Sequence, residues 1–139
     1  MCSILVPVDG SENSDRALRL VISLYQRLAP MDVHLLHVYV PVVTAVEEAD
    51  SQKSVDQDIA AVGKAALRSA RTLLEAAGIS YSCKVLPGYV ASSIVGYAND
   101  NRCDGIIMGT RGMGSTEELL GSIARQVVHL ARVPVTLVK

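Results

Sequence analysis

Five short strand-like runs recur along the chain, and the first of them does not alternate between apolar and polar residues. They occupy residues 4–8, 33–40, 79–86, 105–108 and 134–138. Continuous runs rich in β-branched residues are typical of strands that are buried on both faces of a sheet. The pattern therefore predicts five strands, of which residues 4–8 and 33–40 are expected to be buried on both faces.

Between these runs, apolar residues recur at helical spacing and predict four helices. The first follows a start signal at Ser11 or Ser14 and ends before Pro30, and the second covers about 55–77 and stops at Gly78. The third covers roughly 91–99, with Ser92 or Ser93 as its cap, and the fourth about 122–132. Residues 41 to about 54 are interpreted as an irregular connection.

Strands that alternate with helices require right-handed parallel crossovers. The predicted fold is therefore an α/β three-layer sandwich, in which helices cover both faces of one open, five-stranded parallel sheet. Pro134 cannot donate a ladder hydrogen bond, so the last strand is expected at an edge. Ligands of such sheets bind beyond the carboxyl ends of the strands.

Composition narrows the class of protein. The 139 residues are 50% hydrophobic, which suits a single domain over 1–139 with an aliphatic core, because the chain has no Trp or Phe. The formal charge is −1 and no basic run is present, so nucleic acid is not an expected partner.

The remaining composition predicts the compartment. Cys2, Cys83 and Cys103 are odd in number and lack metal-ligand spacing, which suits reduced thiols, and we expect the last two in or near the core. No leader-like segment and no apolar run of about 20 residues is present. We expect a soluble cytoplasmic protein without membrane contact.

Glycines near the C-terminus suggest a phosphate-binding loop. Gly109, Gly112 and the pair Gly121-Ser122 lie between an apolar strand and an amphipathic helix. Glycine lets the backbone approach an anion closely, and the following helix presents unpaired N–H groups. The alternative is a tight strand-to-helix turn in which Ser122 caps the helix.

Both ends of the chain resemble the universal stress protein family. The resemblance rests on Ile4-Leu5-Val6-Pro7-Val8-Asp9-Gly10-Ser11, on residues 108–114 with 121–124, and on Val133-Pro134-Val135-Thr136-Leu137-Val138. It implies the sheet order 3-2-1-4-5, a dimer in most members, and ATP binding in many of them. The expected ligand is therefore ATP, with a divalent ion such as Mg²⁺ as its companion because the loop carries no P-loop lysine.

One departure from the family pattern concerns the glycine loop. The family's binding pattern is Gly-x2-Gly-x9-Gly-Ser/Thr, whereas eight residues separate Gly112 from Gly121 here. Glu117 and Glu118 also place negative charge in this loop. The deletion and the two glutamates favour an alternative in which the protein binds no nucleotide.

The resemblance implies a set of nucleotide-binding residues. It assigns Pro7, Val8 and Asp9 to the adenosine or metal side, the main chain of Val38 and the side chain of Met108 to the base, and Gly109, Arg111, Gly112, Gly121, Ser122 and Ile123 to the phosphates. Three of these residues have a plainer interpretation. Asp9 is then a turn residue, Val38 is part of the sheet core and Arg111 is an exposed loop cation.

Groups for catalysis are few, so an enzyme is not expected beyond slow ATP hydrolysis. His34 and His37 lie three apart in a predicted strand and so face opposite sides, and no metal site is predicted. No Gly-x-Ser-x-Gly elbow is present. We expect a regulatory stress-response module that dimerises through the edge strand Val133–Val138, and the alternative is a dimeric interaction module without nucleotide.

Overall fold

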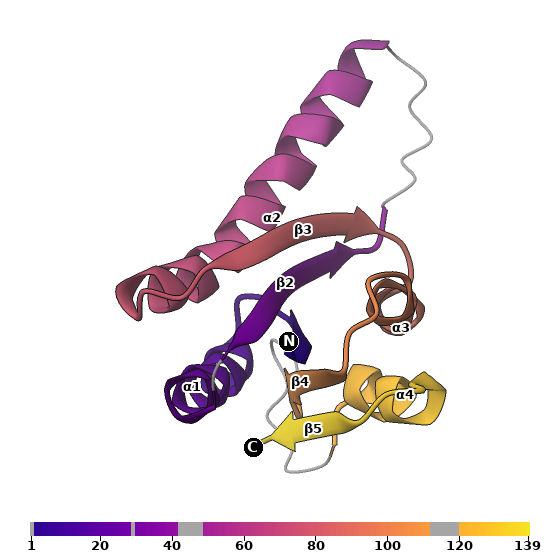
Figure 1. The fold of residues 1–139 in the computed structure, drawn as a ribbon. Helices are drawn as coiled ribbons and strands as arrows, with labels where there is room; N and C mark the ends of the chain where they lie inside the picture. Colours follow the sequence, from indigo (N-terminus) through magenta and orange to yellow (C-terminus); the bar gives the residue numbers. More distant parts are fainter. Residues whose placement is uncertain (1, 29, 42–48, 112–119) are drawn as a thin grey trace.

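A parallel five-stranded sheet forms the middle layer of the molecule (Figure 1). The computed structural model describes residues 2–28, 30–41, 49–111 and 120–139. In the helix that begins at residue 49, it describes side chains only from residue 60 onward. Its elements are β1 (Cys2–Pro7), α1 (Glu12–Arg27), β2 (Met31–Tyr39), α2 (Ala49–Ala76), β3 (Tyr81–Pro87), α3 (Val90–Asp100), β4 (Gly105–Gly109), α4 (Ser122–Leu130) and β5 (Val135–Val138). The strand order is β3-β2-β1-β4-β5, as expected.

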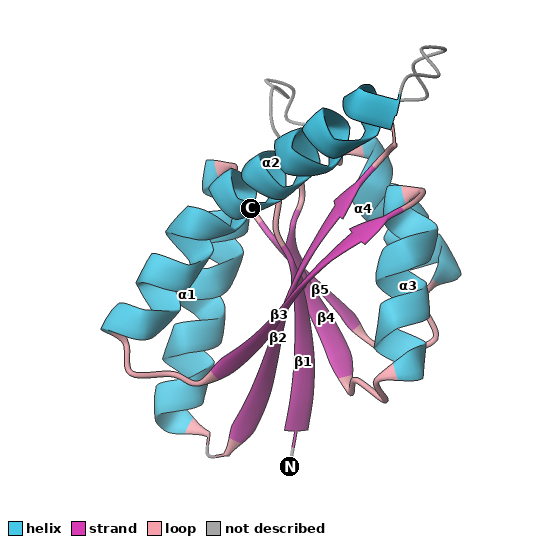
Figure 2. Ribbon diagram, turned by 90° about the horizontal axis from the view of Figure 1, so that it is seen from above, coloured by secondary structure: helices cyan, strands magenta, loops and turns pink. Residues whose placement is uncertain are grey.

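Helices cover both faces of the sheet, which confirms the predicted layers. Figure 2 shows α1 and α2 on one side of the strands and α3 and α4 on the other. Each face has its own apolar core: Val6, Val33 and Leu74 are fully buried on the α1–α2 side. Leu5 and Leu36 are fully buried on the α3–α4 side. Alternation along the buried strands thus supplies two cores from one sheet.

The turn between β1 and α1 is fixed by short-range hydrogen bonds. Ser11 is the N-cap of α1, and its Oγ accepts a hydrogen bond from the N–H of Ser14 at 3.3 Å. A hydroxyl at this position satisfies one of the unpaired donors of the first turn. The helix start predicted at Ser11 or Ser14 is therefore found at Ser11.

Two helix starts differ from the prediction. Helix α2 begins at Ala49 rather than near 55. The sequence did not reveal this earlier start, because residues 50–54 are all polar and show no apolar periodicity. Helix α3 begins at Val90 with Tyr89 as its N-cap, so neither Ser92 nor Ser93 has the predicted role. The side chain of Tyr89 makes no capping hydrogen bond, and the Oγ of Ser92 donates to the carbonyl oxygen of Tyr89 at 3.3 Å.

The thiol of Cys103 is buried, as expected, but Cys83 is exposed. Cys83 lies in β3, which pairs on one side only, with β2. Residues Ser82 to Lys84 of this edge strand are all exposed. An edge strand gains less cover from the helices than a central one, and this explains the wrong prediction.

Among the described residues, no helix is both long and apolar enough to cross a membrane. The carboxyl ends of β1 and β4 lie side by side in the sheet, since the two strands pair in parallel through Ile4 with Gly105 and Leu5 with Ile106. The helices that follow these strands leave to opposite faces. This is the switch point at which open α/β sheets bind ligands.

Candidate functional site

A cavity of about 460 Å³ opens at the carboxyl ends of β1, β2 and β4. Its lining comes from the ends of these three strands and from the starts of α1, α3 and α4: Pro7, Val8, Asp9, Ser14, Leu36, Val38, Val90, Ile94, Met108, Gly109, Thr110, Arg111, Gly121, Ser122, Ile123 and Ala124. A concave site of this size at the switch point is where such folds hold small ligands.

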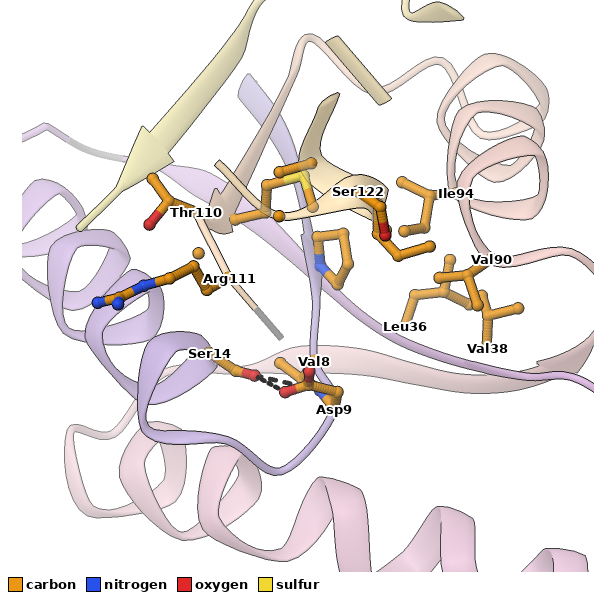
Figure 3. Close-up of a pocket in the computed structure, with 16 residues that line it drawn as sticks. Val8, Asp9, Ser14, Leu36, Val38, Val90, Ile94, Thr110, Arg111 and Ser122 are labelled. Atoms are coloured by element: carbon orange, nitrogen blue, oxygen red, sulfur yellow. Dashed lines mark hydrogen bonds between the residues drawn. The ribbon is translucent and has the colours of Figure 1, made fainter. Parts of the chain in front are cut away.

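One wall of the cavity is apolar (Figure 3). Leu36 and Val38 from β2 lie on the same side of the cavity as Val90 and Ile94 from the first turns of α3. The buried thioether of Met108 adds to this lining at the end of β4. A flat heterocycle could exclude water against these side chains, since apolar lining with few polar groups is typical of such pockets.

The main chain at the end of β1 is held by the neighbouring strand. The N–H of Val8 donates to the carbonyl oxygen of Leu36 at 2.8 Å. The Nδ1 atom of His37 lies 2.8 Å from the carbonyl oxygen of Val8, and this ring nitrogen must carry the proton because a carbonyl oxygen only accepts. The main-chain N–H and carbonyl oxygen of Val8 are therefore both hydrogen-bonded within the protein, and its side chain is the part left to contribute to the cavity.

Val38 differs from Val8 in this respect. Main-chain groups alternate along a strand, so those of Val38 point to the same side as those of Leu36, toward the end of β1. The strand β1 ends at Pro7, which pairs with Leu36. The geometry is therefore compatible with main-chain recognition of a ligand at Val38.

Asp9 is oriented by the first turn of α1. Its Oδ1 accepts a hydrogen bond from the N–H of Ser11 at 2.9 Å. The same oxygen accepts one from the Oγ of Ser14 at 2.7 Å (Figure 3). The Asp9 N–H in turn donates to the Oγ of Ser14 at 3.1 Å. The turn interpretation of Asp9 is correct, and the same bonds hold its carboxylate in the cavity lining.

The first turn of α4 closes the polar end of the cavity. Gly121 is the N-cap, and its N–H donates to the carbonyl oxygen of Thr110 at 2.7 Å. The N-cap position is occupied by Gly121 and not by Ser122, so the predicted capping role of Ser122 is wrong. Residues 121–123 line the cavity, and the start of a helix carries positive partial charge that favours an anion.

Gly109 has a packing role that the motif alone does not reveal. A Cβ atom at this position would lie 2.8 Å from the Cβ of Asn13 and 3.0 Å from its carbonyl carbon and oxygen. Asn13 is buried in the first turn of α1, where its Oδ1 accepts a hydrogen bond from Arg16 at 2.8 Å. The absence of a side chain at Gly109 lets α1 approach the cavity closely.

Charge in the described lining comes from Asp9 and Arg111. In Figure 3 the side chain of Arg111 extends toward α1, away from Val38 and Val90 on the opposite wall. The guanidinium thus lies on the polar side of the cavity, at a distance from the apolar wall. This separation of polar and apolar ends fits a ligand that is itself divided in this way.

The expected site residues therefore meet in one cavity. All of them line it except Gly112, which lies outside the described residues together with Glu117 and Glu118. No site role was predicted for six further lining residues, Ser14, Leu36, Val90, Ile94, Thr110 and Ala124. Val90 and Ile94 could have been found only from their place on α3, because in sequence they look like ordinary helix core.

His34 and His37 have separate hydrogen-bond partners. His34 bonds to Asp32 on its own strand, whereas His37 bonds to Val8. Within the described ranges, no group of three or more His, Cys, Asp or Glu side chains could hold a metal ion.

Several solved structures share this fold. The universal stress protein UspA from Lactobacillus plantarum superposes with a TM-score of 0.82 at 24% identity, covering 99% of this chain and 97% of its own. A universal stress protein solved in complex with cAMP gives 0.69 at 24% identity and covers 99% of this chain and 97% of its own. A family protein from Arabidopsis thaliana, solved with AMP bound, gives 0.70 at 18% identity and covers 100% and 92%.

Sequence comparison extends the likeness beyond the fold. The universal stress protein MJ0531 of Methanocaldococcus jannaschii is 30% identical over 140 residues, which cover 98% of this chain and 81% of that protein. The model of the Universal stress protein family matches residues 1–139. The chain belongs to the universal stress protein family.

Proposed function

We propose that this protein binds an adenine nucleotide, in the form of ATP accompanied by Mg²⁺, in the cavity at the carboxyl ends of β1, β2 and β4. The observation that carries the proposal is the division of one cavity into an apolar wall and an end formed by the first turn of α4. A purine suits the first part and a phosphate group suits the second. Two relatives of the same fold are solved with cAMP and with AMP.

In this proposal each part of the nucleotide has its own contacts. The base lies between Val38 and Met108, and the main chain of Val38 recognises its polar edge. The phosphates lie against residues 109–112 and 121–123, and Arg111 supplies a positive charge. Asp9 binds the ribose hydroxyls or the accompanying Mg²⁺, because a carboxylate is a good ligand for both.

The proposed role is regulatory. Nucleotide in the cavity would join the end of β4 to the start of α4 and so shift the population of conformations that partners recognise. The free cysteines suit the reducing cytoplasm in which we place the protein.

We further propose a homodimer that forms through residues 133–138. Strand β5 pairs on one side only, with β4, and an open edge can pair with a second copy. Val128 and Leu130 on the adjacent helix α4 are each 48% exposed. Burial of these side chains with Leu137 would add apolar contact to the pairing of main chains.

A second candidate is a dimeric interaction module that binds no nucleotide. The shortened spacing between Gly112 and Gly121, together with Glu117 and Glu118, favours it. Thermal denaturation with and without 1 mM ATP and Mg²⁺ separates the two. Binding to the folded state raises the melting temperature by mass action, whereas the second candidate predicts no shift.

A further inference from the structure

A groove of about 590 Å³ lies between β3 and α3, apart from the proposed nucleotide cavity. Its lining residues are Ser82, Cys83, Lys84, Leu86, Ser93, Gly96, Tyr97, Asp100 and Asn101, and none of them lines the first cavity. A Cβ atom at Gly96 would have no neighbour within 4 Å, so this position faces open space. The groove therefore offers space that the proposed function does not use.

Ser82 of the groove lining forms a chain of hydrogen bonds with two side chains of the neighbouring strand β2, His34 and Asp32. The Oγ of Ser82 lies 3.1 Å from the Nδ1 of His34, and the Nε2 of His34 lies 3.1 Å from the Oδ2 of Asp32. The sheet register explains the first contact, because Ser82 pairs directly with His34. Alternation along β2 explains the second, because residues two apart share a face. The Oγ of Ser3 bonds to the same oxygen of Asp32 at 3.4 Å.

This arrangement sets the tautomer of His34. A carboxylate only accepts, so the bond to Asp32 places the proton on Nε2. The single lone pair of Nδ1 is then an acceptor that the hydroxyls of Tyr97, at 2.9 Å, and Ser82, at 3.1 Å, share. A serine hydroxyl, an imidazole that accepts its proton, and a carboxylate that orients the imidazole are the parts of an activated nucleophile. Ser82 is exposed and lines the groove, so a ligand can reach it.

Tyr97 supplies a donor beside the same atoms. Its hydroxyl oxygen lies 2.9 Å from the Nδ1 of His34, and the two rings meet edge to face at 5.7 Å. Burial raises the pKa of the Tyr97 hydroxyl, with a smaller contribution from Cys103. The hydroxyl therefore keeps its proton at neutral pH. When an ester carbonyl enters the groove, this proton turns from Nδ1 to the carbonyl oxygen, where it stabilises a developing oxyanion and frees Nδ1 to accept from Ser82.

We propose that Ser82, His34 and Asp32 form a nucleophilic site that hydrolyses small, uncharged carboxylic esters bound in the groove between β3 and α3. Ser82 Oγ attacks the ester carbonyl carbon while His34 Nδ1 takes the hydroxyl proton, and Tyr97 donates to the carbonyl oxygen. His34 returns the proton to the leaving alkoxide as the C–O bond breaks, which leaves an acyl-serine and a free alcohol. Water then attacks the acyl group by the same route and releases the acid. Asp32 is a positioning residue, because it acts through His34.

The direct test is the hydrolysis of 4-nitrophenyl acetate and butyrate, followed by nitrophenolate absorbance. Ser82→Ala should lower the rate of hydrolysis to that of the same ester in buffer without the protein. Tyr97→Phe should lower kcat about 100-fold, as expected for the loss of one oxyanion donor. Asp32→Asn should lower kcat about 100-fold or more with KM unchanged, because it alters the orientation of His34 and not the groove.

Two controls separate this site from unspecific surface reactivity. Ser80→Ala removes a nearby exposed hydroxyl that does not line the groove and should leave the rate unchanged. A fluorophosphonate probe should label Ser82 in the wild-type protein, as located by peptide mass spectrometry, and this label should be lost in His34→Gln with equal far-ultraviolet dichroism. Absence of turnover in the folded wild-type protein would overturn the proposal. So would turnover that Ser82→Ala retains.

Discussion

A Cβ atom at Gly109 would lie only 2.8 Å from the Cβ of Asn13, a distance that real Cβ atoms essentially never show. The glycine of the proposed phosphate loop is therefore also the point at which α1 packs against the end of β4. Its neighbour in this contact is main chain as well as side chain, so the contact cannot be relieved by a rotamer change.

Gly109→Ala should destabilise the fold by about 1–3 kcal/mol, the usual cost of overpacking. The matched control is Gly96→Ala in α3, where a Cβ atom would meet nothing within 4 Å and should raise stability by about 0.5–1 kcal/mol. Urea denaturation followed by circular dichroism measures both. Equal stability of the two variants would contradict the packing role of Gly109.

Substitutions at Asp9 separate its turn role from its proposed ligand role. Asp9→Ala leaves the N–H of Ser11 and the Oγ of Ser14 without their acceptor and should cost about 1–2 kcal/mol of stability. Asp9→Asn keeps an acceptor oxygen and loses only the charge. It should therefore unfold much as the wild type does and bind ATP with Mg²⁺ at least tenfold more weakly in calorimetric titration. Unchanged affinity in Asp9→Asn would restrict Asp9 to its turn role.

Stability should fall at alkaline pH because of Cys103. Burial, with smaller contributions from Asp104 and Asp32, raises the pKa of this thiol above its usual 9.0. The folded state thus favours the protonated thiol, so the contribution to stability is complete below the unfolded-state pKa and is lost as pH rises through the folded-state value. Urea midpoints measured from pH 7 to 11 should decline less steeply in Cys103→Ala than in the wild type. Parallel declines would exclude the thiol as the cause.

The proposed dimer predicts different outcomes for two substitutions to lysine. Leu137→Lys on β5 should yield a monomer, because it places a charge at the proposed interface. Val62→Lys on α2 is the matched control, since Val62 is 59% exposed and α2 packs beside β3 at the opposite edge of the sheet (Figure 1). Light scattering at micromolar concentration distinguishes the two states. A monomeric wild type, or a dimeric Leu137→Lys, would contradict the interface.

The fold was predictable because both of its periodicities are strong in this chain. Buried parallel strands such as residues 105–108 stand out as continuous apolar runs, and α1 shows its spacing from Ala17 onward. The polar start of α2 was not predictable, because no apolar face marks it. The exposure of Cys83 depends on which strand lies at an edge of the sheet, and the local pattern of apolar residues does not predict the strand order.

The candidate site was predictable where it lies within a motif next to a strand end, as at Asp9 and Ser122. The wall contributed by Val90 and Ile94 was not, since their apolar spacing is that of any packed helix. The contact between Ser82 and His34 is likewise invisible in sequence, because it depends on the register between β2 and β3.

The central claim is that the cavity beyond β1, β2 and β4 binds an adenine nucleotide. Isothermal titration with ATP and Mg²⁺ tests it most directly, after absorbance at 260 nm has established that the purified protein carries no nucleotide. The control is Gly121→Val, because the φ of −62° at this N-cap suits valine while the larger side chain enters the lining. The account predicts saturable binding with a micromolar Kd that is lost in Gly121→Val. No heat from the folded, nucleotide-free wild type would contradict it and favour the interaction module.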